Sequence, residues 1–125
     1  MSVVNEAARY AGIELVEIEP ERALLRFVVG PHHVNGHGVC HGGFVFLLAD
    51  EAFGCACNSA GTSTVASGGE ISFLRPARIG EELHAEATLR SMSGRSGIYD
   101  VTVRSADGVV AEFRGRSRAV PNWSG

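Results

Sequence analysis

The chain of 125 residues contains no lysine, and all eleven of its lysine-or-arginine positions are arginine. Codon bias in a GC-rich genome explains such a composition. It also leaves arginine as the residue able to hold phosphate groups through forked hydrogen bonds. An excess of charge of one sign is missing too. The formal net charge of -3 at pH 7 gives no reason to expect nucleic acid or an anionic membrane as a partner.

Targeting and membrane-spanning signals are also missing. No basic and apolar signal stretch opens the chain, and no apolar run reaches the length of a spanning helix. The three cysteines are an odd number, and Cys55 and Cys57 project about 200° apart on a helix, which disfavours a disulfide between them. Reduced thiols in a cytoplasmic protein are therefore expected. The length and the lack of repeats predict one domain, residues 1–125.

The most informative segment that is present runs from residue 35 to residue 58. A polar, glycine-rich loop leads into an almost wholly apolar stretch, which predicts a helix from residue 42 to about residue 58. A helix that is apolar on every side is a buried helix. A carboxylate such as Asp50 is costly there unless it has a partner or a task. Asp50 is therefore either the centre of a functional site or a structural carboxylate paired with an arginine. Glu51 is expected to be exposed or at an interface.

Gly42 is expected in the first turn of this helix, where backbone N–H groups are unpaired and carry partial positive charge. Such an N–H, with no side chain in the way, suits an oxyanion hole. Asp50 follows eight residues later, about 12 Å further along the helix. Both groups must come within about 3 Å of one reacting centre. This geometry predicts a site shared across a two-fold dimer, with Gly42 of one chain facing Asp50 of the other.

The rest of the chain predicts an α+β fold of order α-β-β-α-β-β-β-β. A helix is expected at residues 2–11, a loop at 30–40 and a frayed end at 121–125. Alternating apolar residues predict strands at 13–18, 23–29, 64–74, 83–90, 99–103 and 109–113, with a bulge at Gly68 and Gly69. One curved antiparallel sheet wrapped around the long central helix satisfies this order. Since the helix is apolar all round, a second subunit could bury what the sheet leaves uncovered.

Histidines in the loop raise the possibility of a metal site. His33, His37 and His41 have the spacing of one helical face, and Cys40 lies among them. A proline and two glycines argue against a helix there, however, and no second motif completes a zinc pattern. Neither a metal nor another cofactor is therefore expected. His41 is instead expected to fix the loop or to contact an acyl group, and Cys40 lacks the partner pattern of a catalytic thiol.

A set of short motifs spans about residues 30–117, most of the chain. They are Asn35-Gly36, Cys40-His41-Gly42-Gly43, Leu48-Ala49-Asp50, Ala56-Cys57-Asn58-Ser59, Phe73-Leu74-Arg75-Pro76, Gly97-Ile98-Tyr99-Asp100-Val101 and Phe113-Arg114-Gly115. In these motifs the chain resembles the hotdog-fold acyl-CoA thioesterases, and within them the phenylacetic-acid-pathway group usually called PaaI.

The resemblance implies a dimer with a continuous sheet, often doubled to a homotetramer, that hydrolyses acyl-CoA thioesters without a metal. It implies an aryl-acetyl-CoA substrate, such as phenylacetyl-CoA or a hydroxylated derivative. The carboxylate would come from Asp50 and the oxyanion donor from the Gly42 N–H. Asn35 would orient water or the carbonyl, and His41 would support the loop.

Further residues are predicted to bind substrate. Gly43 follows Gly42 in the motif, and Phe46 lies further along the predicted helix. Arg75, Arg78 and Arg95 lie at strand ends or turns, where they can meet the phosphates of coenzyme A.

Two other functions remain open on the same fold. A hydroxyacyl thioester dehydratase or hydratase needs a histidine acting with the carboxylate, and His41 stands next to Gly42 rather than in the usual partner position. A non-catalytic acyl-CoA-binding protein normally carries an added DNA-binding segment. Fold alone does not decide between these functions.

Overall fold

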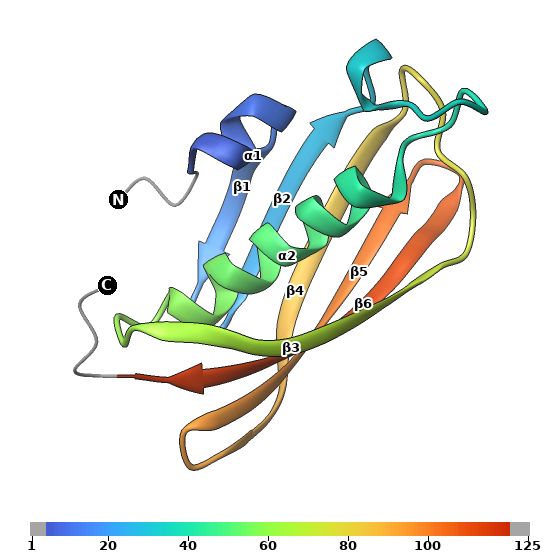
Figure 1. Cartoon of the computed structure of the whole chain (residues 1–125). Coiled ribbons are helices and arrows are strands. Elements are labelled where there is room, and N and C mark those ends of the chain that lie inside the picture. Colours follow the sequence, from blue (N-terminus) through green and yellow to red (C-terminus); the bar gives the residue numbers. More distant parts are fainter. Residues whose placement is uncertain (1–4, 121–125) are drawn as a thin grey trace.

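A computed structural model describes residues 5–120, in which helices pack against a curved sheet (Figure 1). Six strands make a single sheet of order β1-β2-β4-β5-β6-β3, in which every neighbouring pair is antiparallel. The strands are β1 (Glu14–Glu19), β2 (Arg22–Val28), β3 (Thr64–Phe73), β4 (Glu82–Ser93), β5 (Ser96–Ser105) and β6 (Gly108–Ala119). The expected α+β hotdog fold is confirmed. The end predicted to fray, residues 121–125, lies outside the described residues.

The long helix α2 (Gly42–Asn58) lies against the curved sheet and crosses its strands (Figure 1). Its bounds match the prediction, and Gly61 with φ of 90° follows it. Burial of apolar surface between helix and sheet stabilises this arrangement. The core side chains that α2 contributes include Val45, Leu48, Ala52, Phe53 and Ala56, which pack with Leu25, Phe27, Leu83, Val101 and Phe113 of the sheet.

The sheet covers only one side of α2, as the all-round apolar sequence predicted. On the other side Phe46 keeps 37% of its surface exposed. Asp50, Glu51 and Gly54 follow along the helix and are half-buried. None of the helices within residues 5–120 combines the length and the apolar character needed to cross a membrane. This uncovered face of α2 is the part of the fold that bears on the site.

The first helix, α1 (Glu6–Ala11), is shorter than the predicted 2–11. Asn5 precedes it as an N-cap, because its side chain accepts a hydrogen bond from the N–H of Ala8 at 2.9 Å. Gly12 ends the helix with φ of 79°, a left-handed conformation that glycine adopts without strain. Residues 2–4 of the predicted helix lie outside the described part of the chain.

Bulges shift three details of the predicted strands. The β3 bulge falls at Ser67, one residue before the predicted pair of glycines. In β6 an extra residue, Val110, is buried where simple alternation placed Val109. In β4 a bulge at Arg90 lets the strand continue through Ser93, beyond its predicted end at residue 90. Each bulge inserts one residue, so alternation beyond it changes face.

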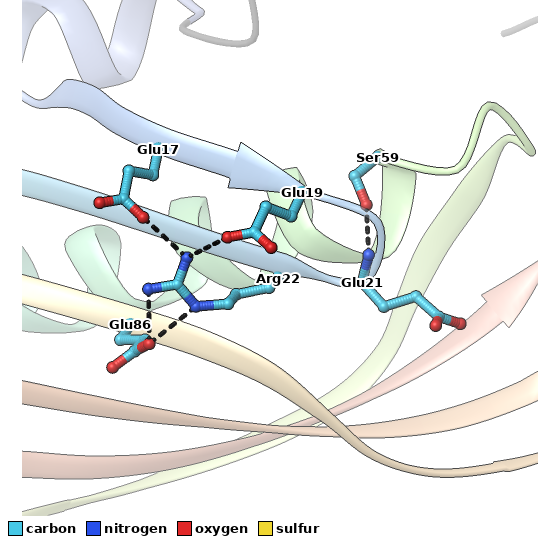
Figure 2. A network of polar contacts seen from close by, with 6 residues as sticks. All are labelled: Glu17, Glu19, Glu21, Arg22, Ser59 and Glu86. Carbon is cyan, nitrogen blue, oxygen red and sulfur yellow. Dashed lines mark hydrogen bonds and ion pairs between the residues drawn. The ribbon is translucent and has the colours of Figure 1, made fainter.

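Ion pairs join the outer surfaces of β1, β2 and β4 (Figure 2). The guanidinium of Arg22 contacts three carboxylates, those of Glu17 at 2.9 Å, Glu19 at 3.0 Å and Glu86 at 2.7 Å. The three carboxylates are partly exposed, so each pair contributes little free energy alone. Together they fix the edge strand β1 to the sheet.

The turn between β1 and β2 carries a strained residue, Glu21, with φ of 65°. Its N–H donates to the Oγ of Ser59 at 2.7 Å, just beyond the end of α2 (Figure 2). Its carbonyl accepts from the N–H of Leu89 at 3.1 Å. These two bonds hold a non-glycine residue in the left-handed region and tie the end of α2 to the sheet.

Candidate active site

Asp50 lies in the middle of α2, at the edge of a hollow of about 330 Å³ on the uncovered face. Within residues 5–120 its carboxylate has neither an ion pair nor a hydrogen bond, so the alternative of an arginine-paired structural carboxylate is wrong for the chain as described. Burial raises the pKa of Asp50 above its usual value. A carboxylate without a partner and with a raised pKa is suited to accept a proton.

The lining of this hollow includes Glu51 and Asn5, whose contact the sequence did not indicate. The amide nitrogen of Asn5 donates to Oε1 of Glu51 at 2.8 Å, although 46 residues separate them. Burial raises the pKa of Glu51, the hydrogen bond from Asn5 opposes the shift, and the Asp50 charge adds to it. The N-cap of α1 therefore forms part of the wall beside Asp50. A capping pattern in the sequence could identify Asn5 but not this contact.

The far wall of the hollow is fixed by Asn58, the last residue of α2. Its amide nitrogen donates to the carbonyls of Gly54 at 3.0 Å and Thr64 at 3.2 Å, while its oxygen accepts from the N–H of Thr64 at 2.9 Å. Thr64 and Ala66 of β3 line the hollow opposite α2. Asn58 therefore holds β3 at a set distance from the helix.

Gly42 lines a second hollow of about 390 Å³ at the start of α2. Among residues 5–120 its N–H has no hydrogen-bond acceptor, as expected of the first residue of a helix. The ring of Phe73 covers the glycine, since a Cβ at this position would lie 3.0 Å from it. The N–H is thus free to donate to a ligand in a mostly apolar hollow.

The loop before Gly42 is held by hydrogen bonds that place the helix start. Nδ1 of His41 accepts from the N–H of Gly43 at 2.8 Å, so His41 caps α2. The N–H of His41 in turn donates to the carbonyl of His33 at 2.7 Å. The oxygen of Asn35 accepts from the backbone N–H groups of His37 at 2.8 Å and Val39 at 3.4 Å, which fixes the turn of this loop.

The two hollows have no lining residue in common, so one chain does not bring Gly42 and Asp50 into one cavity. This agrees with the separation of about 12 Å that eight helical residues impose. Phe46 lies between the two positions along α2, where its ring packs edge-on against Phe113 with centroids 5.4 Å apart.

The three arginines predicted to meet phosphate lie in two places. Arg75 lines the hollow of Gly42 and donates to the carbonyl of Asp107. Arg78 pairs through its backbone with Val39 in the loop before α2. Arg95 lies in the turn between β4 and β5, and its carbonyl accepts from the last residue of β6. Within one chain the structure brings together the first two and not the third.

The cysteines and histidines were candidates for a catalytic thiol and for metal ligands. No disulfide joins the three cysteines, all of which lie within the described residues, and burial raises their pKa, to about 11 for Cys40 and Cys57 and about 12 for Cys55. Thiols with a raised pKa are poor nucleophiles at neutral pH. Within residues 5–120 no three His, Cys, Asp or Glu side chains are grouped closely enough to hold a metal ion.

A curved sheet wrapped around α2, with a carboxylate and an N–H on that helix that have no partner among the described residues, is the arrangement that the resemblance to hotdog thioesterases implied. The thioesterase superfamily profile matches residues 37–112 of the chain, which therefore belongs to this family. The matched range includes all of α2, and with it Gly42 and Asp50.

Individual proteins similar to this chain are also thioesterases or PaaI proteins. The chain is 41% identical to the acyl-coenzyme A thioesterase PaaI of Escherichia coli over 118 residues, which cover 93% of this chain and 84% of that protein. The solved structure of that protein superposes with a TM-score of 0.90. A PaaI structure from Thermus thermophilus, 31% identical, also gives 0.90 and covers 93% of this chain and all of that one. Mouse acyl-coenzyme A thioesterase 13 is 33% identical over 57% of this chain and 52% of its own length.

Proposed function

We propose that this thioesterase hydrolyses acyl-CoA esters at a site built from two copies of the chain. The Gly42 N–H of one protomer polarises the thioester carbonyl, and Asp50 of the other supplies the carboxylate. The observation that carries the proposal is that the Gly42 N–H and the half-buried Asp50 carboxylate lie in separate hollows of one chain. Neither group has a partner among the described residues. A two-fold dimer through the uncovered face of α2 would supply each hollow with its missing group.

The chemistry requires each group once. Attack on the carbonyl carbon places negative charge on the carbonyl oxygen, and the Gly42 N–H at the positive end of α2 stabilises that charge. Asp50 either takes a proton from the attacking water or attacks the carbon itself, forming an anhydride that water then cleaves. The carbon–sulfur bond breaks in both routes, and the products are the free acid and coenzyme A.

The two routes differ in where the oxygen of the product comes from. In a single turnover in water labelled with ¹⁸O, a general base leaves the label only in the acid. A nucleophilic Asp50 transfers its own unlabelled oxygen to the first product and becomes labelled itself when water attacks the aspartyl carbonyl of the anhydride. Label found by mass spectrometry in the peptide containing Asp50 therefore establishes the nucleophilic route.

The acyl group that we propose is aryl-acetyl, as in phenylacetyl-CoA or a hydroxylated derivative. Support comes from the Escherichia coli relative PaaI, an acyl-CoA thioesterase from the phenylacetic acid degradation operon. Around Asp50, small residues such as Gly54 and Ala66 leave the hollow of about 330 Å³ open to a ring.

Coenzyme A itself would be recognised through arginine, since the chain has no lysine. Arg75 and Arg78 lie near Gly42, and Arg95 approaches from the opposite end of the sheet, where a partner subunit could bring it to the same substrate. Gly43 and Phe46 would contact the substrate from α2, and the amide of Asn35 would orient the water or the carbonyl.

A substrate screen tests the proposal. Aryl-acetyl, benzoyl and aliphatic CoA esters are compared by release of free thiol, with kcat/KM expected to be highest for the aryl-acetyl esters. Preference for aliphatic esters would overturn the acyl assignment. Tight binding of every ester without thiol release would instead show a non-catalytic acyl-CoA-binding protein.

A further inference from the structure

A buried histidine, His33, has a ring whose two nitrogens are both committed to backbone groups. It is 2% exposed. Its Nδ1 accepts from the N–H of Gly30 at 2.8 Å, and its Nε2 lies 2.8 Å from the carbonyl of Ala11. An N–H can only donate and a carbonyl can only accept, so Nδ1 carries no proton and Nε2 carries one. The contacts therefore require the neutral ring in one tautomer.

The same residue joins three segments next to Gly42. Its ring links the end of α1 to the turn at Gly30, and it packs edge-on against Phe44 in the first turn of α2 with centroids 4.8 Å apart. Its carbonyl accepts from the N–H of His41, the residue that caps α2. Displacement of the His33 ring would therefore act on both anchors of the helix start.

Protonation of the ring is incompatible with these contacts. A proton on Nδ1 would face the N–H of Gly30, two donors with no acceptor between them, in a buried position. Among residues 5–120, the one titratable group facing the ring is His32, whose ring centroid is 3.8 Å away. Phe27 of β2, Phe44 of α2 and the Ala11 carbonyl of α1 bring no charge. Burial lowers the pKa of His33. The hydrogen bond to the Ala11 carbonyl opposes this shift, and the charge of His32 adds to it.

We propose that His33 is a positioning residue for thioester hydrolysis. Its neutral ring holds the turn of His41 and Gly42 so that the Gly42 N–H points at the thioester carbonyl, and protonation releases that turn. The proposal rests on the proposed role of Gly42. It adds a second proton that must be absent for activity, besides the one on Asp50.

Kinetics as a function of pH tests the proposal. In the wild-type enzyme, log kcat is expected to fall with a slope approaching two at a pH below both pKa values, because Asp50 and His33 are both protonated. The variant His33→Gln can still donate to Ala11 but takes up no proton. We expect kcat to fall about 10- to 100-fold, with KM within about twofold and an acid slope of one. The matched control His32→Gln, which changes the exposed neighbouring ring, should keep the slope of two.

Nuclear magnetic resonance keeps the proposal testable even if His33→Gln folds poorly. In folded Asp50→Asn protein, where Asp50 no longer titrates, ¹⁵N shifts of the His33 ring should show the Nε2–H tautomer. The amide signal of Gly42 should shift with the same midpoint as that ring. An acid slope of one in the wild type, unchanged kcat in His33→Gln, or a Gly42 amide that ignores the His33 titration would each overturn the proposal. Full activity of Asp50→Asn would instead contradict the proposed function.

Discussion

Replacing Asp50 by asparagine should abolish turnover and at the same time stabilise the fold. The amide keeps the shape of the carboxylate but neither takes a proton nor attacks carbon, so kcat should fall about 10²- to 10⁴-fold. Among the residues that the structure describes, the lining of the hollow holds one further carboxylate, that of Glu51, and Asn5 already occupies one of its oxygens, so we expect no compensation.

The expected stability change has a definite sign. The pKa of Asp50 is higher in the folded chain than its ordinary value of 3.8, so the ionised form favours the unfolded state. Its contribution to stability is fully present below pH 3.8 and is lost as the pH rises through the folded pKa. The neutral asparagine avoids this loss. At pH 7 the variant should therefore be more stable, by about 0.5–2 kcal/mol.

Two assays on the same preparations check both effects. Thiol release from an aryl-acetyl-CoA ester gives kcat, and thermal unfolding at pH 7 and near pH 4 gives the stability difference. The difference should shrink toward the lower pH, because a raised pKa makes Asp50 take up its proton there more readily than in the unfolded chain. Activity within a few fold of the wild type, or a variant less stable than the wild type at pH 7, would refute the reasoning about Asp50.

Three further substitutions give separate expectations. Arg75→Ala should raise KM about tenfold for a CoA ester and leave it unchanged for a short thioester without the nucleotide; equal changes would assign Arg75 to the fold. Glu21→Gly should raise the free energy of unfolding by about 1 kcal/mol, because φ of 65° costs glycine nothing; a loss in a denaturant titration would contradict this. Gly115→Ala should destabilise by about 1–3 kcal/mol, since its Cβ would lie 2.8 Å from the buried ring of Phe53; an unchanged midpoint would show that the core adapts.

Much of the fold was predictable because its signals are local. The apolar run from residue 42 to residue 58 and the alternating strands follow directly from helical and strand periodicity. The bulges at Ser67 and Val110 were misplaced or missed, because a bulge depends on which residue of the neighbouring strand it faces. The start of α1 was wrong because the capping role of Asn5 competes with its inclusion in the helix.

The candidate site was predictable to a smaller extent. A carboxylate in an apolar helix identified Asp50, and helical rise separated it from Gly42 without any coordinates. The contact of Asn5 with Glu51 and the committed ring of His33 join segments far apart in the chain. Such contacts depend on tertiary packing, which the periodicity of a single sequence does not encode. The same holds for Arg95, which lies away from Arg75 and Arg78 within one chain.

The central claim is that each site takes Gly42 from one chain and Asp50 from the other, and mixed dimers test it. Gly42→Pro removes the N–H donor, and the chain tolerates proline there for two reasons. Position 42 is the first residue of α2, and His41 already has ψ of 135°, the conformation favoured before proline. Gly42→Ala is the matched control, because it adds a Cβ against Phe73 but keeps the N–H.

Each inactive variant, Gly42→Pro and Asp50→Asn, is unfolded and refolded with an equal amount of the other, and dimers carrying two different tags are isolated. Such a dimer contains one site with both good groups and one with neither. Random mixing makes about half of all dimers mixed, so the unfractionated sample should regain about a quarter of wild-type activity and the isolated heterodimer about half. Gly42→Ala alone should keep most of its activity. A pure heterodimer without thioesterase activity would place both groups in one chain's site and contradict the account.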